Sequence, residues 1–132
     1  MVRYSLLPLW YTAFYEAYTT GQPVMRTMFS EFPDDRNTFA MDDQWLVGGS
    51  LLVKPVTEEG QTTATVYLPK SSDTDGWFDL HTLMLAPSVE GGVITVDAPL
   101  GFIPVYIRAG AICSEAQGDI DYAFHQNMAL CD

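Results

Sequence analysis

The chain has 132 residues, 48% of them hydrophobic and 13% aromatic, and a formal net charge of −11. This is the size of one ordinary domain and about half of a (β/α)8 barrel, so a complete barrel is excluded. The six basic residues argue against nucleic acid and anionic membranes as partners, because phosphate binding requires Lys and Arg. No apolar run reaches the ~20 residues of a membrane span. We expect no metal or cofactor, since His81 and His125 lie far apart and no metal-ligand cluster is present.

Residues 3–20 are predicted to form a helix, because apolar side chains recur there at helical spacing. These are Leu6, Trp10, Ala13, Phe14 and Ala17. Pro8 is tolerated if it lies in the first turn and the regular helix begins near Leu7. Gly21 is a good helix terminator in a left-handed conformation. A short strand is predicted over 24–29, which completes half of a βαβ unit. One such half cannot bury both of its faces, so we expect further sequence upstream.

Residues 30–45 are rich in turn formers and acidic side chains. Pro33 and the Asp34–Asp35 pair indicate a turn. Asp42 or Asp43 is expected to cap a short helical turn over residues 44–47. Adjacent side chains usually diverge rather than converge on one small site. Both aspartate pairs are therefore interpreted as structural rather than catalytic.

The periodicity changes from helical to strand-like after residue 50. Short β-rich runs are separated by Gly, Pro, Ser and Asp clusters, at the spacing of an antiparallel sandwich. The predicted strands are 51–56, 64–69, 76–80, 92–99 and 103–109. The tail has no clear period. Its two cysteines, Cys113 and Cys131, are interpreted as unpaired thiols, with a disulfide in an oxidising compartment as the alternative.

Read in order, several segments resemble the glycoside hydrolase family 31 α-glucosidases. They are Leu6–Tyr15, Pro23–Arg26, Asp43–Gly48, Leu52–Val56, Trp77–Asp79 and Ile103–Arg108. The resemblance implies a mixed fold, in which a helix and strand from the end of a (β/α)8 barrel precede an antiparallel β-sandwich. The implied domains are the barrel end over 1–48, the proximal C-terminal sandwich over 49–112 and a tail of unknown structure over 113–132.

Enzymes of this family are retaining, and two carboxylates about 5–5.5 Å apart perform the reaction. The family's motifs for these carboxylates lie upstream of the matching region, and neither occurs in this sequence. No catalytic residue is therefore assigned, and the isolated chain is predicted to be inactive. We expect its partners to be the rest of the barrel and, in the full-length enzyme only, an α-linked glucoside.

Two residues are candidates for substrate binding. Arg26 lies on the last barrel strand, near the face where barrel loops build the site, and is a candidate to support it. Trp77 is either a sugar-stacking residue or, more in keeping with its position, a core residue. Within the family, the helix and the Asp42–Gln44 segment look most like the glucosidase II catalytic subunit. That resemblance implies a possible regulatory subunit and the endoplasmic reticulum lumen, with the targeting signal missing from this chain.

Two alternatives remain open from the sequence. The first is a non-catalytic carbohydrate-binding sandwich that uses Trp77, Phe78 or Tyr67 as a stacking platform. The second is an interaction module with an acidic face, whose binding would weaken with salt.

Overall fold

The computed structural model describes residues 2–70 and 76–111 of the chain. Its helices are α1 (Val2–Ser5), α2 (Leu7–Thr20), α3 (Met28–Glu31) and the 3-10 helix η1 (Arg36–Thr38). Its strands are β1 (Met25–Thr27), β2 (Trp45–Val47), β3 (Leu51–Val53), β4 (Thr63–Tyr67), β5 (Trp77–Asp79), β6 (Val93–Asp97) and β7 (Val105–Arg108). The predicted tail and both cysteines lie outside the described residues. None of the described helices is long and apolar enough to cross a membrane.

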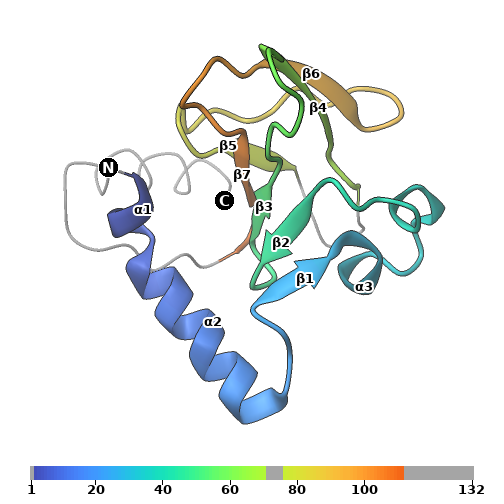
Figure 1. The fold of residues 1–132 in the computed structure, drawn as a ribbon. Helices are drawn as coiled ribbons and strands as arrows, with labels where there is room; N and C mark the ends of the chain where they lie inside the picture. The colour runs from blue at the N-terminus through green and yellow to red at the C-terminus, as the bar shows by residue number, and fades with distance from the viewer. Residues whose placement is uncertain (1, 71–75, 112–132) are drawn as a thin grey trace.

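The strands form two antiparallel sheets (Figure 1). One has five strands in the order β1-β2-β3-β7-β5, and the other is a two-stranded ribbon of β4 and β6. The first three strands of the larger sheet follow one another along the chain. Strand β7 pairs with β3 on one side and β5 on the other, with Leu51 opposite Ile107. The expected antiparallel sheets with few helices are therefore confirmed.

The five-stranded sheet is covered on both faces. One face packs Leu46, Leu52 and Tyr106 into a core with Val66 and Ile94 of the ribbon. The other face packs Val47, Leu51 and Ile107 into a second core with Leu6 and Leu9. Neighbouring residues on one strand point to opposite faces, so each adjacent apolar pair supplies one side chain to each core. This double burial explains why these strands read as continuous apolar runs.

Helix α2 begins and ends where its sequence predicts. Its first residue is Leu7 with Pro8 in the first turn, and it is followed by Gly21 at φ 77°. The Gly21 N–H donates to the Ala17 carbonyl at 3.0 Å, which satisfies one of the last free carbonyls of the helix. Both boundary predictions are confirmed.

The described residues cover only one side of α2. Leu9 and Ala13 are buried against the sheet. The opposite side presents large apolar residues to solvent, with Tyr11 79% and Tyr18 88% exposed. Leu7, Phe14 and Tyr15 on the helix, and Tyr4 just before it, are more than half exposed as well. We call these six residues (Tyr4, Leu7, Tyr11, Phe14, Tyr15 and Tyr18) the aromatic face of α2.

Two local predictions differ from the structure. The predicted helical turn over 44–47 is wrong, because Trp45–Val47 is strand β2 and pairs with β1 and β3. The strand expected over 24–29 is shorter, since α3 begins at Met28 directly after β1. The pairing of β2 with β3 joins the two sides of position 48 in one sheet. The division into domains at that position stays a prediction.

Candidate functional site

Arg26 lies in β1 and is held by groups from three neighbouring segments. Its Nη1 donates to Glu31 Oε1 of α3 at 2.9 Å, and its Nη2 pairs with Glu16 Oε2 of α2 at 3.3 Å. Its Nε donates to the Pro23 carbonyl at 3.1 Å. The Arg26 side chain is only 13% exposed. Arg26 therefore links α2, β1 and α3, and its guanidinium donors are directed at groups of this chain.

Trp77 lies in β5 and is 3% exposed. Its indole N–H donates to the Pro69 carbonyl at 2.9 Å. Its ring packs at 60° to the ring of Phe32, with 6.2 Å between centroids. The Arg108 guanidinium lies over the Phe32 ring, 5.2 Å from its centroid. These contacts place the Trp77 indole in the core, with its polar atom satisfied.

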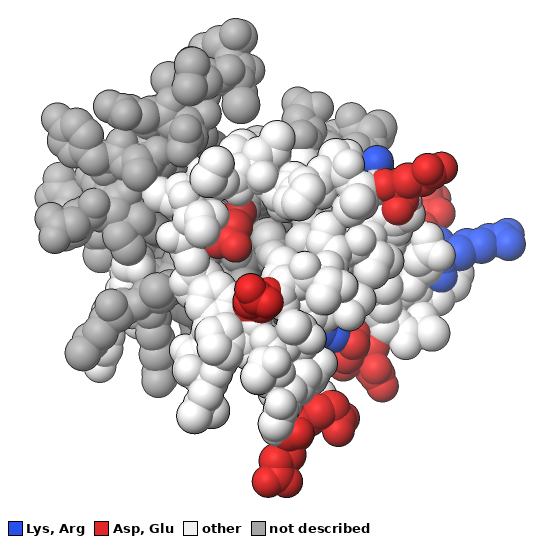
Figure 2. Space-filling view, turned by 90° about the horizontal axis from the view of Figure 1, so that it is seen from above, with Lys and Arg blue, Asp and Glu red and all other residues white. Residues whose placement is uncertain are grey.

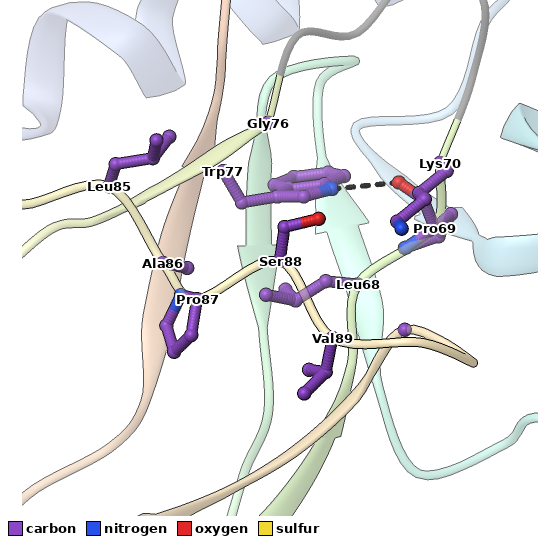
Figure 3. A pocket seen from close by; sticks show the side chains of 11 residues that line it. Leu68, Pro69, Lys70, Gly76, Trp77, Leu85, Ala86, Pro87, Ser88 and Val89 are labelled. Carbon is purple, nitrogen blue, oxygen red and sulfur yellow. Dashed lines mark hydrogen bonds between the residues drawn. The ribbon is translucent and has the colours of Figure 1, made fainter.

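A pocket of about 300 Å³ opens beside Trp77 (Figure 3). Most of its wall is apolar, formed by Leu68, Pro69, Leu85, Ala86, Pro87 and Val89. Lys70 and Ser88 are the polar side chains on its wall among the described residues. The pocket lies on the side of the sheet that carries Trp77, and Arg26 is not among its lining residues. The structure thus does not bring the two sequence-predicted site residues together.

Gln44 joins the segment after β1 to the two-stranded ribbon. Its Nε2 donates to the Tyr67 carbonyl at 2.7 Å, and its Oε1 accepts from the Tyr67 N–H at 3.0 Å. The residue is 3% exposed. Its side-chain amide thus pairs with the Tyr67 backbone much as a neighbouring strand would, so both buried backbone groups are satisfied.

The Tyr67 hydroxyl also reaches the segment after β1. It donates to the carboxylate of Asp35 and accepts from Asn37 Nδ2 at 3.2 Å. Asp35 in turn caps η1 by accepting from the Asn37 N–H at 3.0 Å. Burial, followed by the hydrogen bond to Asp35, raises the pKa of Tyr67 above its ordinary value of 10. We call Tyr67, Asp35 and Asn37 the tyrosine cluster.

One aspartate of each pair singled out from the sequence makes structural contacts. Asp43 forms an ion pair with Lys54, which is buried. Asp35 belongs to the tyrosine cluster. In residues 2–70 and 76–111 there is no group of three or more His, Cys, Asp or Glu side chains that would suit a metal ion.

Comparison with known proteins decides the family. The family profile described as "Glycosyl hydrolase family 31 C-terminal domain" matches residues 21–113. The chain belongs to glycoside hydrolase family 31. It is 46% identical to neutral alpha-glucosidase AB of Dictyostelium discoideum, over 87% of this chain and 12% of that protein. It is also 46% identical to glucosidase 2 subunit alpha of Schizosaccharomyces pombe, over 84% of this chain and 12% of that protein.

The fold agrees with solved structures of the same family. A family 31 dextranase of Flavobacterium johnsoniae superposes with a TM-score of 0.73 at 39% identity, covering 89% of this chain and 15% of the dextranase. The chain thus spans about an eighth of the length of these relatives. The predicted family is confirmed, and the two sequence relatives named above are a neutral alpha-glucosidase and a glucosidase 2 subunit.

The contacts that sequence reasoning missed are those of Gln44 and Tyr67. The Asp43–Gly48 segment was recognised as part of the family pattern, but nothing in it named a partner for Gln44. One signal was present. A lone glutamine directly before a strand buried on both faces must find hydrogen-bond partners if it is itself buried.

Proposed function

We propose that this family 31 chain contributes the end of the catalytic barrel and the proximal C-terminal sandwich to a retaining α-glucosidase. In this proposal α2 and β1 are the last helix and strand of the barrel. The remaining strands form the sandwich that supports them. The similarity to α-glucosidases at 46% identity supports the reaction class, and the coverage of 12% of those proteins supports a contribution by part of the enzyme.

The observation that carries the proposal is the aromatic face of α2. Six large apolar side chains lie open to solvent on one side of α2, whose other side is already packed. Five belong to α2 itself, and Tyr4 lies just before it. A contiguous apolar surface of this kind marks an interface. Strand β1, which follows α2, is also an edge strand of its sheet among the described residues. A helix and strand with an open side are what remains of a βαβ unit when the preceding strand is absent.

The proposed partner is therefore the rest of the catalytic barrel, and the glucoside substrate belongs to the assembled enzyme. The resemblance to glucosidase II adds a regulatory subunit to the proposal, and this subunit would engage the same longer protein. The reaction requires two carboxylates about 5–5.5 Å apart, which we assign to the rest of the barrel. The isolated chain is expected to hydrolyse no glycoside.

Activity measurements test this directly. The purified chain and a longer polypeptide that includes the barrel are assayed with a nitrophenyl α-glucoside. We expect turnover from the longer polypeptide alone. Turnover by the purified chain that survives contaminant controls would refute the assignment of the chemistry to the rest of the barrel.

A binding experiment tests the interface. The barrel region is produced separately, and its capture of this chain is measured by calorimetry. Phe14→Asp, on the aromatic face, is expected to weaken capture at least 10-fold. Leu100→Asp, at a fully exposed apolar residue away from α2, is the matched control and should leave capture unchanged. Equal effects of the two variants would refute the aromatic face as the interface.

The two alternatives have less support. Trp77 is only 3% exposed, so its ring offers little surface for stacking a sugar. Saturable glucose binding that Trp77→Ala leaves unchanged would support carbohydrate binding but not stacking on Trp77. Acidic side chains on the face shown in Figure 2 lie singly or in small groups separated by uncharged surface. That distribution gives no continuous acidic surface on this side of the molecule.

A further inference from the structure

The segment from Met28 to Gln44 follows the carboxyl end of β1. If the proposed function holds, on which this inference rests, β1 is the last barrel strand and this segment is the loop after it. Active sites of barrel enzymes are built from the loops at the carboxyl ends of the strands. We infer that Tyr67 is a positioning residue, which fixes this loop for catalysis through the bonds of its hydroxyl group to Asp35 and Asn37.

The contacts of the tyrosine cluster are specific to the hydroxyl. The Tyr67 O–H donates to the Asp35 carboxylate, and Asn37 Nδ2 donates both to this hydroxyl at 3.2 Å and to Asp35 Oδ1 at 3.1 Å. The three groups therefore form a closed set of hydrogen bonds between β4 and the loop. A hydrogen bond with a charged acceptor is stronger than one between neutral groups, which favours one loop position.

Other contacts hold the loop internally but do not replace this link. The Thr38 hydroxyl donates to the Asp35 carbonyl at 2.7 Å, so it stabilises η1 from within. Gln44 binds the backbone of Tyr67 at the far end of the loop. Phe32 and Met41, on either side of the tyrosine cluster, pack against the core, and Thr38 is buried. Removing only the Tyr67 hydroxyl therefore loosens Asp35 and Asn37 between these anchors, and keeps the Tyr67 ring and the strand pairing of β4.

The Tyr67 hydroxyl stays protonated, and therefore a hydrogen-bond donor, near neutral pH. Burial and the hydrogen bond to Asp35 both favour the protonated phenol and raise the pKa of Tyr67. The link between β4 and the loop consequently does not depend on pH through Tyr67 at neutral pH.

The experiment compares Tyr67→Phe with Tyr106→Phe in the longer polypeptide that includes the barrel. Tyr106→Phe is the matched control, because it removes the hydroxyl of another buried tyrosine in the same core, one that is not a member of the tyrosine cluster. We expect Tyr67→Phe to lower kcat about 10-fold with KM changed less than about 2-fold, since small misplacements of site groups cost up to about 100-fold. The control should retain the wild-type kcat. Both are measured at a temperature where circular dichroism shows each variant fully folded.

Hydrogen exchange on the 132-residue chain supplies a readout that does not depend on activity. In Tyr67→Phe the amides of Asn37 and Thr38 should exchange faster, while those of α2 and of the β4–β6 pairs keep their wild-type rates. A variant that loses protection everywhere has a folding defect. The more conservative Asp35→Asn, which keeps an acceptor for the hydroxyl, should then show the local increase alone.

The outcomes separate the two claims. Inactivity of the wild-type longer polypeptide overturns the proposed function and the catalytic role of the loop with it. Activity of the wild type together with equal kcat values for Tyr67→Phe and Tyr106→Phe overturns only the positioning role. A selective fall in kcat with local loss of protection supports it.

Discussion

Replacing Gln44 with leucine tests whether one side-chain amide holds the two sheets in register. Leucine has a similar size but offers no hydrogen bonds, so the Tyr67 N–H and C=O lose the partners they have at 3.0 and 2.7 Å. Each buried backbone group left unpaired costs about 1–3 kcal/mol. Burial of the leucine side chain recovers about 1.5–3 kcal/mol. The expected net loss is about 2 kcal/mol in the free energy of unfolding.

This loss is a large part of the stability of an ordinary domain, which is about 5–15 kcal/mol. Urea unfolding followed by tryptophan fluorescence measures it as a shift in midpoint at constant m-value. The control is Gln61→Leu, at an exposed position, where the change should stay within about 0.5 kcal/mol. A Gln44→Leu loss as small as that of the control would refute the reasoning, since the Tyr67 backbone must then be satisfied in another way.

Gln44→Glu sharpens the same test. Glutamate keeps an acceptor for the Tyr67 N–H but places a carboxylate oxygen against the Tyr67 carbonyl, which accepts from Gln44 in the wild type. The variant should be destabilised at neutral pH. Its deficit should narrow as the pH falls, because the protonated carboxyl group can again donate. A deficit independent of pH would contradict the donor role assigned to the amide.

Three further predictions concern other parts of the molecule. Gly92→Ala should lower the free energy of unfolding by at least about 1 kcal/mol more than Gly91→Ala. Both glycines have positive φ, but only at Gly92 would a Cβ lie 2.8 Å from a backbone oxygen. Calorimetric unfolding of the two variants measures the difference. Arg26→Met should lower the free energy of unfolding, measured in urea, by about 1–3 kcal/mol, because it leaves the largely buried Glu31 carboxylate unpaired. A change near zero would contradict the role of Arg26 in linking α2, β1 and α3. Burial raises the pKa of Tyr106 to about 12 from an ordinary value of 10. The folded state therefore favours the protonated phenol, and the stability that this contributes is fully present below pH ~10. The free energy of unfolding should fall between pH ~10 and pH ~12 more steeply in the wild type than in Tyr106→Phe. Parallel plots of stability against pH for the two proteins would refute this.

The ends of helix α2 were predictable because local chemistry sets them. Proline fits the first turn of a helix, and glycine adopts the left-handed conformation that ends one at little cost. Pro8 and Gly21 act through their own backbone and their nearest neighbours. The contacts that decide these boundaries lie within a few residues, so one sequence suffices.

Strand β2 was mistaken for a helical turn because the contacts that decide its conformation are distant. An aspartate before Gln44 resembles a helix cap, and three residues are too few for a clear period. In the structure Leu46 pairs with Arg26 on one side and Leu52 on the other. Two flanking strands outweigh a weak local preference, which is the usual way tertiary context overrides propensity.

The candidate site was predictable only in part for the same reason. Arg26 and Trp77 stood out as residue types, and the structure gives each a partner set that no spacing revealed. Tyr67 and Asp35 meet across 32 positions of sequence. A hydrogen bond between residues that far apart leaves no periodic trace, so a single sequence cannot disclose it.

The place of β7 in the larger sheet has a consequence for synthesis on the ribosome. Strand β7 is the last described element of the chain, yet it lies between β3 and β5 and is the only strand that pairs with β5 in this sheet among the described residues. The nascent chain can form the β1-β2-β3 meander early, but β3 keeps an open edge until residues 54–104 have been made, about 3–10 s at ordinary elongation rates. During that interval the emerging protein exposes an apolar strand edge to other chains. We therefore expect chaperone contact with this domain to be greatest just before residue 105 leaves the exit tunnel.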